Sequence, residues 1–457
     1  MGVNATLNAA RLGLAASQFA IDVTAANVTN VNTPGYVRQR PEFEAAGAID
    51  VSAKSFQIGV DISQVKRVYD RYLEAQITDG KTEVGYSTTA QDYLQRVEGL
   101  FNESNGGGIN ELLGEFWTSW KNLTTNPQGR AERTVVQAAA VDLAARFREF
   151  SDDLTSIAMD ARDEIGTTVL AVNSDLEKIA ELNNEIMTQG SDNGDANLLL
   201  DERAKLLTSV AEKIGINYIQ DAHGNIDIYL TSGSSLVQAG SFRELEMVGD
   251  DIRLMGTTEL VTAAITSGKL GAMLEVRDRL VPGYLDSLNS LASGIVTAVN
   301  GEHEKGYTAS GEVAGDFFVP VGSPATAARN MAVSADIIAD LGNIAASTTV
   351  DGNGDNAREI GAIADRLINW GTSTTTANGY FGALTAQVGQ DVSNAISRKD
   401  HRDIIMNQLE EKWQSASGVS VDEEMMNLIK YQMGYNAAGR LVTVADELMD
   451  TLINLGK

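Results

Sequence analysis

The first forty residues carry apolar and small side chains at alternating spacings of three and four. Such spacing places them on helix faces. The sequence predicts that this helix ends before Pro34, because the residue preceding a proline disfavours the α conformation, and Pro34-Gly35 then suits a type II turn. One face comprises Leu7, Ala10, Leu14, Ser17, Ile21, Thr24, Val28 and Val31, and a second comprises Leu12, Ala16, Phe19, Val23 and Ala26.

The last forty residues share this design, with small residues that allow close approach. Asp422, Glu423 and Glu424 mark the helix start, since carboxylates in a first turn favour the helix dipole. One stripe comprises Gly434, Ala438, Leu441, Ala445, Leu448, Leu452 and Leu455, and another comprises Met425, Leu428, Tyr435, Val442, Met449 and Ile453.

A helix with two apolar stripes cannot be buried by one partner helix. We therefore predict that the two ends pack on each other and then on copies of themselves, with an ordinary multi-helix core as the alternative. The predicted subunit-interface residues are Leu7, Leu14, Phe19, Ile21, Val28, Leu428, Tyr435, Leu441, Val442, Leu448, Met449, Leu452 and Leu455.

Between the two ends, the pattern is mainly helical. Residues 131–188 lack proline and keep helical spacing, which predicts a rod-like helix of about 80 Å with Gly166 as its weak point. Alternation of apolar and polar residues predicts a single strand from Phe56 to Ile62, after an extended loop over residues 45–55. Helical spacing resumes near Val65, and a separate helix follows around residues 93–101.

Residues 215–266 change character and predict a hairpin followed by short strands. The predicted fold is mainly α with a small β insert: N- and C-terminal helices paired as a coiled-coil core, a long helical-bundle rod domain, and a small outer β-rich domain. The predicted domains are the N-terminal core helix (1–33), an extended linker with strands (34–65), the rod domain in two parts (66–214 and 267–418), the β-rich domain (215–266) and the C-terminal core helix (419–457).

Composition narrows the possible functions. The formal net charge of −27 disfavours nucleic acid and anionic lipid as partners, because both require Lys and Arg. The absence of cysteine excludes disulfides and thiolate metal sites. No run of about 18 apolar residues predicts a membrane span, and the N-terminus does not resemble an ordinary cleavable signal peptide. A secreted chain would leave the cell by another route.

Motifs for catalysis or cofactor binding are weak. His223, His303 and His401 are far apart in sequence, so they are predicted to be surface histidines rather than metal ligands. Gly80-Lys81-Thr82 lacks the first glycine of a phosphate loop. The acidic loop 351–355 lacks the glycine and the glutamate of a calcium loop, and is interpreted as a solvated turn, with weak cation binding as the alternative. We predict no enzyme, no cofactor, no metal and no catalytic residues.

Several stretches nevertheless resemble a known group of proteins. Near its N-terminus the sequence resembles the signature of bacterial flagellar axial proteins (rod, hook and junction). The residues that carry this resemblance are Asn27, Asn30, Pro34, Gly35, Tyr36 and Arg38. Further stretches narrow the resemblance to the flagellar hook-associated protein 1 family: residues 97–101, 130–138, Asn197 with Asp201 and Arg203, 268–271, Asn300 with His303, 315–318, and 421–424 with Tyr431, Tyr435 and Asp446.

The resemblance implies a secreted structural protein of the bacterial flagellum, at the hook–filament junction. It implies export without a cleaved signal by a type III apparatus with an export chaperone, and terminal helices that are largely disordered before assembly. The implied partners are other copies in a ring, the hook protein and the next junction protein. Because residues 319–354 are few, a second outer β domain found in relatives is expected to be missing.

Two alternatives stay open at this point. A hook or distal-rod subunit would share the terminal signature, although the long helix over 131–188 disfavours it because hook proteins are richer in β structure. A secreted hydrolase or metal enzyme with axial-type terminal helices is the alternative of a different class, and it would require a role for His303 or a bound metal.

Overall fold

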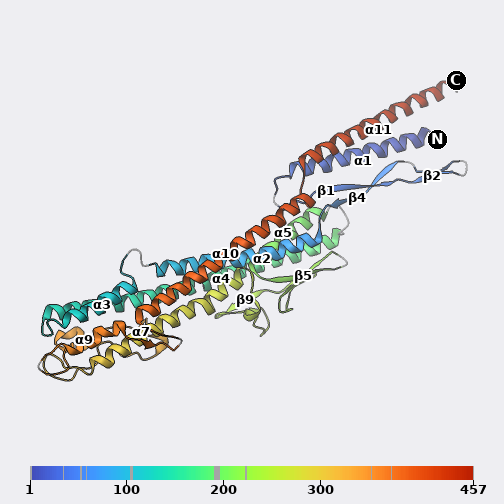
Figure 1. Ribbon diagram of the computed structural model, residues 1–457. Helices are drawn as coiled ribbons and strands as arrows, with labels where there is room; N and C mark the ends of the chain where they lie inside the picture. Colours follow the sequence, from blue (N-terminus) through green and yellow to red (C-terminus); the bar gives the residue numbers. More distant parts are fainter. Residues whose placement is uncertain are drawn as a thin grey trace. The chain divides into compact units, whose positions relative to one another are not determined.

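The computed structural model describes residues 3–33, 35–51, 54–57, 59–102, 106–189, 196–221, 224–350, 352–371 and 373–455. The chain is mainly helical with several small sheets, as the sequence predicted (Figure 1). It divides into two compact units, which are described separately below. Unit 1 comprises Met1–Gly85, Thr168–Gly268 and His401–Lys457, and unit 2 comprises Tyr86–Thr167 and Lys269–Asp400.

The two ends of the chain pair in unit 1. Helix α1 (Val3–Thr29) lies along α11 (Val421–Leu455), and both termini lie at the same end of the pair (Figure 1). The helices are antiparallel, because Asn27 contacts Glu424 at one end and Gly13 faces Ala438 further along. The predicted pairing of the terminal helices is therefore confirmed.

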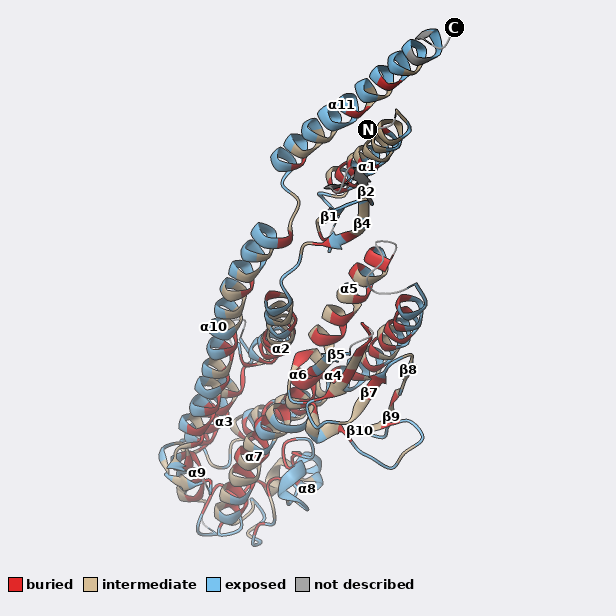
Figure 2. Ribbon diagram, turned by 90° about the vertical axis from the view of Figure 1, so that its right-hand side faces the viewer, coloured by how far each residue is buried: buried red, intermediate tan, exposed pale blue. Residues whose placement is uncertain are grey.

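Small residues form the surface between α1 and α11. A Cβ atom on Gly13 would lie 3.4 Å from that of Ala438, and one on Gly434 would lie 3.1 Å from the Ser17 hydroxyl. Figure 2 shows α11 with a narrow buried face and extensive exposed surface. The buried alanines of the two helices are Ala10, Ala16, Ala20, Ala438 and Ala445.

The predicted stripe of α11 does not act as one face. Its small members face α1, whereas Leu441 and Leu448 are exposed. The reason is that close approach of the two backbones at glycine and alanine leaves no room for leucine between them.

After α1 the chain forms strands, and two of them occupy the region where an extended loop over residues 45–55 was predicted. Strand β1 (Gln39–Ala45) pairs with β4 (Val60–Arg67), and β2 (Ala48–Val51) pairs with β3 (Lys54–Gln57). The single strand predicted from Phe56 to Ile62 is wrong, because β3 and β4 are separate. Gly59, between them, has φ +86° and lies close to the side chain of Leu12.

Three long helices contribute residues to both units: α2 (Arg71–Phe101), α4 (Arg130–Gln189) and α10 (Ala377–Ser417). The long helix predicted over residues 131–188 is confirmed. The prediction of helix from Val65 is wrong, since Val65 belongs to β4 and α2 begins at Arg71. Where two helices were predicted, α2 is continuous, and a Cβ atom on its Gly85 would lie 2.2 Å from the Glu212 carbonyl oxygen, so glycine allows close packing.

The β insert of unit 1 follows α5 (Asn197–Lys213). Strands β5 (Ile216–Gln220), β6 (Ile226–Leu230), β7 (Ser235–Gln238) and β8 (Ser241–Phe242) form a four-stranded sheet in chain order, and β9 (Leu245–Val248) pairs with β10 (Asp251–Leu254). The predicted hairpin and short strands are confirmed. In the predicted turn, residues 222 and 223, including His223, lie outside the described residues.

Unit 2 is built around α3 (Ile109–Leu123) and α7 (Val281–His303). Between residues 319 and 350 its described part has short helices and no strand, as expected for a chain without the second β domain. The remaining elements include η2 (Thr262–Ala264) of unit 1, α6 (Gly268–Glu275) at the boundary, and, in unit 2, the π-helical η3 (Val276–Leu280), η4 (Pro324–Thr326), α8 (Ala335–Ala339), η5 (Leu341–Asn343), α9 (Asp355–Gly361), η6 (Ala362–Asp365), β11 (Ile368–Asn369) and β12 (Thr374–Thr375).

His303 lies in the aromatic core of unit 2, so its predicted surface position is wrong. The side chain is fully buried beside Trp120 and Phe317. Its Nδ1 lies 2.7 Å from the Gly315 carbonyl oxygen, and its Nε2 accepts a hydrogen bond from the Ala345 N–H at 2.9 Å. Burial lowers the pKa of His303 to about 4. The neutral ring therefore joins two loops, while His401 is exposed as predicted.

Gly166 is a point of α4 that a side chain could occupy. A Cβ atom there would meet no atom within 4 Å, and the backbone is helical. We expect Gly166→Ala to raise the free energy of unfolding by about 0.5–1 kcal/mol, because alanine loses less backbone entropy than glycine in a helix. Native-state hydrogen exchange of the α4 amides in both proteins measures the difference. An unchanged or lowered stability would show that this helix position does not behave as an open, regular one.

Candidate functional site: the junction at the exit of α1

The turn that ends α1 has the predicted form. The Tyr36 N–H donates a hydrogen bond to the Thr33 carbonyl at 3.2 Å, and Gly35 has φ +83°, as the third residue of a type II turn requires. Asn30 supports the turn, because its Oδ1 accepts a hydrogen bond from the Thr33 hydroxyl. Pro34 lies outside the described residues.

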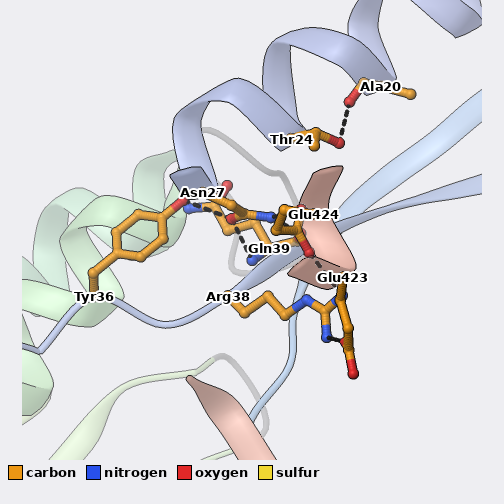
Figure 3. A network of polar contacts seen from close by, with 8 residues as sticks. All are labelled: Ala20, Thr24, Asn27, Tyr36, Arg38, Gln39, Glu423 and Glu424. Carbon is orange, nitrogen blue, oxygen red and sulfur yellow. Dashed lines mark hydrogen bonds and ion pairs between the residues drawn. The ribbon is translucent and has the colours of Figure 1, made fainter. Parts of the chain in front are cut away.

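Asn27 uses all of its hydrogen-bonding capacity at this exit. Its Oδ1 accepts bonds from the Tyr36 hydroxyl (2.9 Å) and the Gln39 N–H (3.0 Å). Its Nδ2 donates to the Gln39 carbonyl (2.8 Å) and to Oε2 of Glu424 (3.0 Å), as Figure 3 shows. The side chain is 1% exposed. One buried amide therefore connects α1, the outgoing chain and α11.

Arg38 holds the first turn of α11 from the other side. Its guanidinium lies 2.7 Å from a carboxylate oxygen of Glu423 and 2.7 Å from one of Glu424 (Figure 3). Burial alone would lower the pKa of Arg38, but the two glutamates outweigh it and the pKa is raised. The Arg38 backbone also donates to the Ser417 carbonyl and accepts from the Val68 N–H. The end of α10 and the end of β4 thus meet at this residue.

Asp201 of α5 anchors the same segment. Its carboxylate accepts a hydrogen bond from the Val37 N–H at 3.4 Å and lies 2.6 Å from Nη2 of the buried Arg67. Burial raises the pKa of Asp201, and Arg67 opposes that shift. Burial, followed by Asp201 and Glu424, also raises the pKa of Tyr36 to about 12. The phenol therefore stays protonated and can donate to Asn27 over the physiological pH range.

A second amide in unit 1 joins the β insert to the helices. Asn183 of α4 donates to the carbonyls of Ile226 and Ala239, and its Oδ1 accepts from Arg203 of α5 at 2.8 Å. Asp201 and Arg203 are thus two residues apart on α5, one serving the exit of α1 and the other serving the sheet. The two contacts explain why acidic and basic residues occupy buried positions on one helix.

Sequence reasoning singled out Asn27, Tyr36 and Arg38, and the structure brings these residues together with Glu424. Sequence reasoning missed the roles of Gln39, Arg67 and Asp201, because their contacts depend on chain segments that are distant in sequence. It also treated Glu424 only as a favourable first-turn charge. Three acidic residues at a helix start give no signal for which one is buried.

Chemistry beyond these contacts is limited in the described residues. They contain no group of three His, Asp or Glu side chains that could hold a metal ion. A cleft of about 1980 Å³ in unit 1 lies between α2, α5, β5 and the end of α10, and charged pairs such as Arg67–Asp201 and Lys81–Glu410 line it. In the loop predicted as a solvated turn, Asn353 bonds Asp355 and Asp355 pairs with Arg358. Asp351 lies outside the described part.

The predicted subunit-interface residues fall into three groups. One group is half-buried and a second group is exposed in the single chain. For Leu452 and Leu455, the side chains lie outside the described part. The half-buried group is Leu7, Leu14, Ile21, Val28, Leu428, Val442 and Met449, and the exposed group is Phe19, Tyr435, Leu441 and Leu448.

Comparisons with known proteins agree with this arrangement. A family model described as the flagellar hook-associated protein FlgK helical domain matches residues 94–318. The flagella basal body rod protein model matches residues 7–36, and the flagellar basal body rod FlgEFG protein C-terminal model matches residues 412–455. Flagellar hook-associated protein 1 of Bacillus subtilis is 30% identical over 98% of this chain and 97% of its own length. The chain belongs to the flagellar hook-associated protein 1 family.

More distant relatives extend the same result. Flagellar hook-associated protein 1 of Salmonella typhimurium is 23% identical over 99% of this chain and 100% of its own length. The solved structure of the flagellar hook junction protein FlgK from Burkholderia pseudomallei has a similar fold, with a TM-score of 0.66 and 14% identity. That similarity covers 74% of this chain and 99% of the other chain. The helical domain matches the hook-associated family model, whereas the rod-protein models match only the two ends of the chain.

No helix in the described part of this hook-associated protein is both long enough and apolar enough to cross a membrane.

Proposed function

We propose that this chain is a structural subunit of the bacterial flagellum that connects the hook to the filament and has no catalytic activity. It is exported by the flagellar type III apparatus with the help of an export chaperone, and it takes its place outside the cell at the hook–filament junction. Family membership supports this proposal.

The observation that carries the proposal is an apolar stripe on α11 that α1 leaves uncovered. The side chains of the stripe are exposed beside Ala438 and Ala445, which are buried. Met433 is 66% exposed and Leu448 is 48% exposed. Contiguous exposed apolar surface marks an interaction site. The exposed stripe of α11 comprises Met426, Met433, Leu441, Val444 and Leu448.

In this proposal, copies of the chain form a ring and cover one another's terminal helices. The exposed and half-buried interface residues named above supply the contacts between copies, and the hook protein and the next junction protein adjoin the ring. The terminal helices gain most of their stability in the assembly, because isolated helix pairs depend on tertiary packing.

The test of this function is electron microscopy of cells that lack the protein. We expect bare hooks, with filament subunit released into the medium, and restoration of filaments by a plasmid copy. Normal filaments in the deletion strain would contradict the proposed role. Filaments lost together with hooks would instead indicate a hook or rod subunit.

Leu448→Asp is expected to abolish filament attachment without unfolding the subunit. Leu448 is exposed in the single chain, so a carboxylate there is solvated until another copy covers it, when burial of the charge becomes strongly unfavourable. Motility assays and electron microscopy measure the effect, and circular dichroism checks the fold.

Thr443→Asp is the matched control, because Thr443 is exposed on the polar side of the same helix. The control variant is expected to swim normally. Equal motility of the two variants would show that the exposed stripe of α11 is not an assembly surface. Leu14 is less suitable for this test, since it is half-buried against the chain itself.

A further inference from the structure

The packing between α1 and α11 does little to define how far one helix is displaced along the other. Gly13 faces Ala438 and Ser17 faces Gly434, and the other buried contributors are mainly alanines. The closest approaches at these positions are therefore between small residues. A shift by one helical turn brings Gly13 opposite Gly434 in one direction and Ser17 opposite Ala438 in the other, so these small residues alone discriminate weakly between registers.

Buried polar groups at one end of the α1–α11 pair discriminate strongly between registers. The Glu424 side chain is 2% exposed, and its carboxylate meets Asn27 Nδ2 at 3.0 Å and Arg38 at 2.7 Å. Asn27 is equally buried, and Glu424 takes one of its four hydrogen bonds. A shift by one turn would move Glu424 away from both partners and leave a buried carboxylate with neither, which is strongly unfavourable.

We propose that Asn27 and Glu424 form a register lock, a specificity-determining pair that permits one alignment of the two terminal helices. Packing of small residues supplies close approach, and the lock supplies the choice of register. Arg38 reinforces the choice, because it contacts both Glu423 and Glu424 from a segment that Asp201 and Ser417 hold in place. A single buried asparagine that selects register is a known device in paired helices.

The lock also defines which helix the exit of α1 accepts. At this exit, the Asn27 amide and the Arg38 guanidinium both contact carboxylates in the first turn of α11. The acceptable partner is therefore a helix whose first turn carries two adjacent glutamates. This inference concerns one chain and does not depend on the proposed place of the protein in the flagellum.

The absence of cysteine makes the register measurable by disulfide trapping. A Cβ atom on Gly13 would lie 3.4 Å from that of Ala438, close to the separation in a disulfide. The pair G13C/A438C therefore reports the observed register, while G13C/G434C and G13C/V442C report shifts of one turn in either direction. Each full-length variant is oxidised at low concentration, so that cross-links form within a chain, and the cross-linked fraction is read by peptide mass spectrometry.

In the otherwise unchanged chain, we expect the 13–438 cross-link to exceed each shifted cross-link by more than about tenfold, because a shift strands a buried charge. In the double variant Asn27→Ala/Glu424→Ala, which removes both partners together, we expect that excess to be lost and the shifted cross-links to appear. The ratio of cross-links reports register even when the pair forms only transiently, since oxidation traps whichever alignment occurs.

Thr24→Ala is the matched control for the register lock. Thr24 is buried on the same helix one turn earlier, but its hydroxyl bonds only to the Ala20 carbonyl of α1 in the observed network (Figure 3). The control is expected to retain the 13–438 preference. An unchanged preference in the Asn27→Ala/Glu424→Ala chain would overturn the lock, and absence of any cross-link in the unmodified background would overturn the pairing on which it rests.

Discussion

Asn27→Leu is expected to weaken the α1–α11 pair by about 3 kcal/mol, one of the two largest effects that the structure predicts. Leucine has a similar size, but it offers no hydrogen bond to the Tyr36 hydroxyl, the Gln39 backbone or Glu424. Four groups lose a partner at once, and one of them is the buried carboxylate of Glu424. Removal of one partner of a buried charge is more harmful than removal of both.

Native-state hydrogen exchange of the full-length chain is the suitable measurement, because a chain with two units does not unfold in one step. We expect amides of α1 and α11 in the Asn27→Leu variant to exchange roughly a hundredfold faster, while amides of α3 and α7 in unit 2 keep their rates. The control is Thr24→Val, which keeps the shape of a buried side chain and loses only a bond within α1. Similar exchange in the two variants would contradict the role assigned to Asn27.

The second large effect is a dependence of unit 2 on pH through His303. Its pKa is about 4 in the folded chain, because burial disfavours the imidazolium, against about 6.5 in an unfolded chain. Between these values the unfolded state binds a proton that the folded state does not. Stability therefore falls as the pH is lowered from about 6.5 to about 4, by about 3 kcal/mol in total.

Protonation of Nε2 would also place an N–H group against the Ala345 N–H. In the neutral ring, Nε2 accepts a hydrogen bond from that N–H. His303→Gln can keep both contacts, since its amide offers one donor and one acceptor without titrating. Carboxylates titrate over part of the same range, so the quantity to measure is the difference between the wild type and this variant. We expect native-state hydrogen exchange at several pH values to show that the stability of unit 2 in the wild type falls relative to the variant as the pH is lowered from about 6.5 to about 4. A constant difference between the two proteins would show that His303 titrates normally and is not buried as described.

Prediction from sequence succeeded where a residue's role depends on its near neighbours. The spacing of apolar residues located α1, α4 and α11, and the pairing of the two ends followed from the excess of apolar faces. The Pro34-Gly35 dipeptide specified a turn whose Gly35 has the expected left-handed conformation. These features follow from helical periodicity and backbone sterics, which act over a few residues.

Prediction failed where the outcome depends on what packs against a residue. Leu441 and Ala445 occupy the same predicted stripe, yet only the alanine is buried, because the helices approach too closely for leucine. His303 was assigned to the surface because the three histidines are far apart in sequence, but two backbone partners from other loops satisfy its buried ring. Similarly, β2 and β3 formed where a Gly- and Ala-rich loop was expected, since pairing between strands overrides weak local propensity.

The sequence by itself determined the helices, the terminal pairing, the exit turn and the family of this chain, because each depends on periodicity or on a local motif. Only the tertiary structure decided which glutamate is buried, which apolar side chains remain exposed and which amide connects the two ends. Asn27 and Glu424 are 397 positions apart, and no local pattern distinguishes Glu424 from Glu423. Burial and hydrogen bonding between them arise only when α1 and α11 lie together and remove both side chains from water.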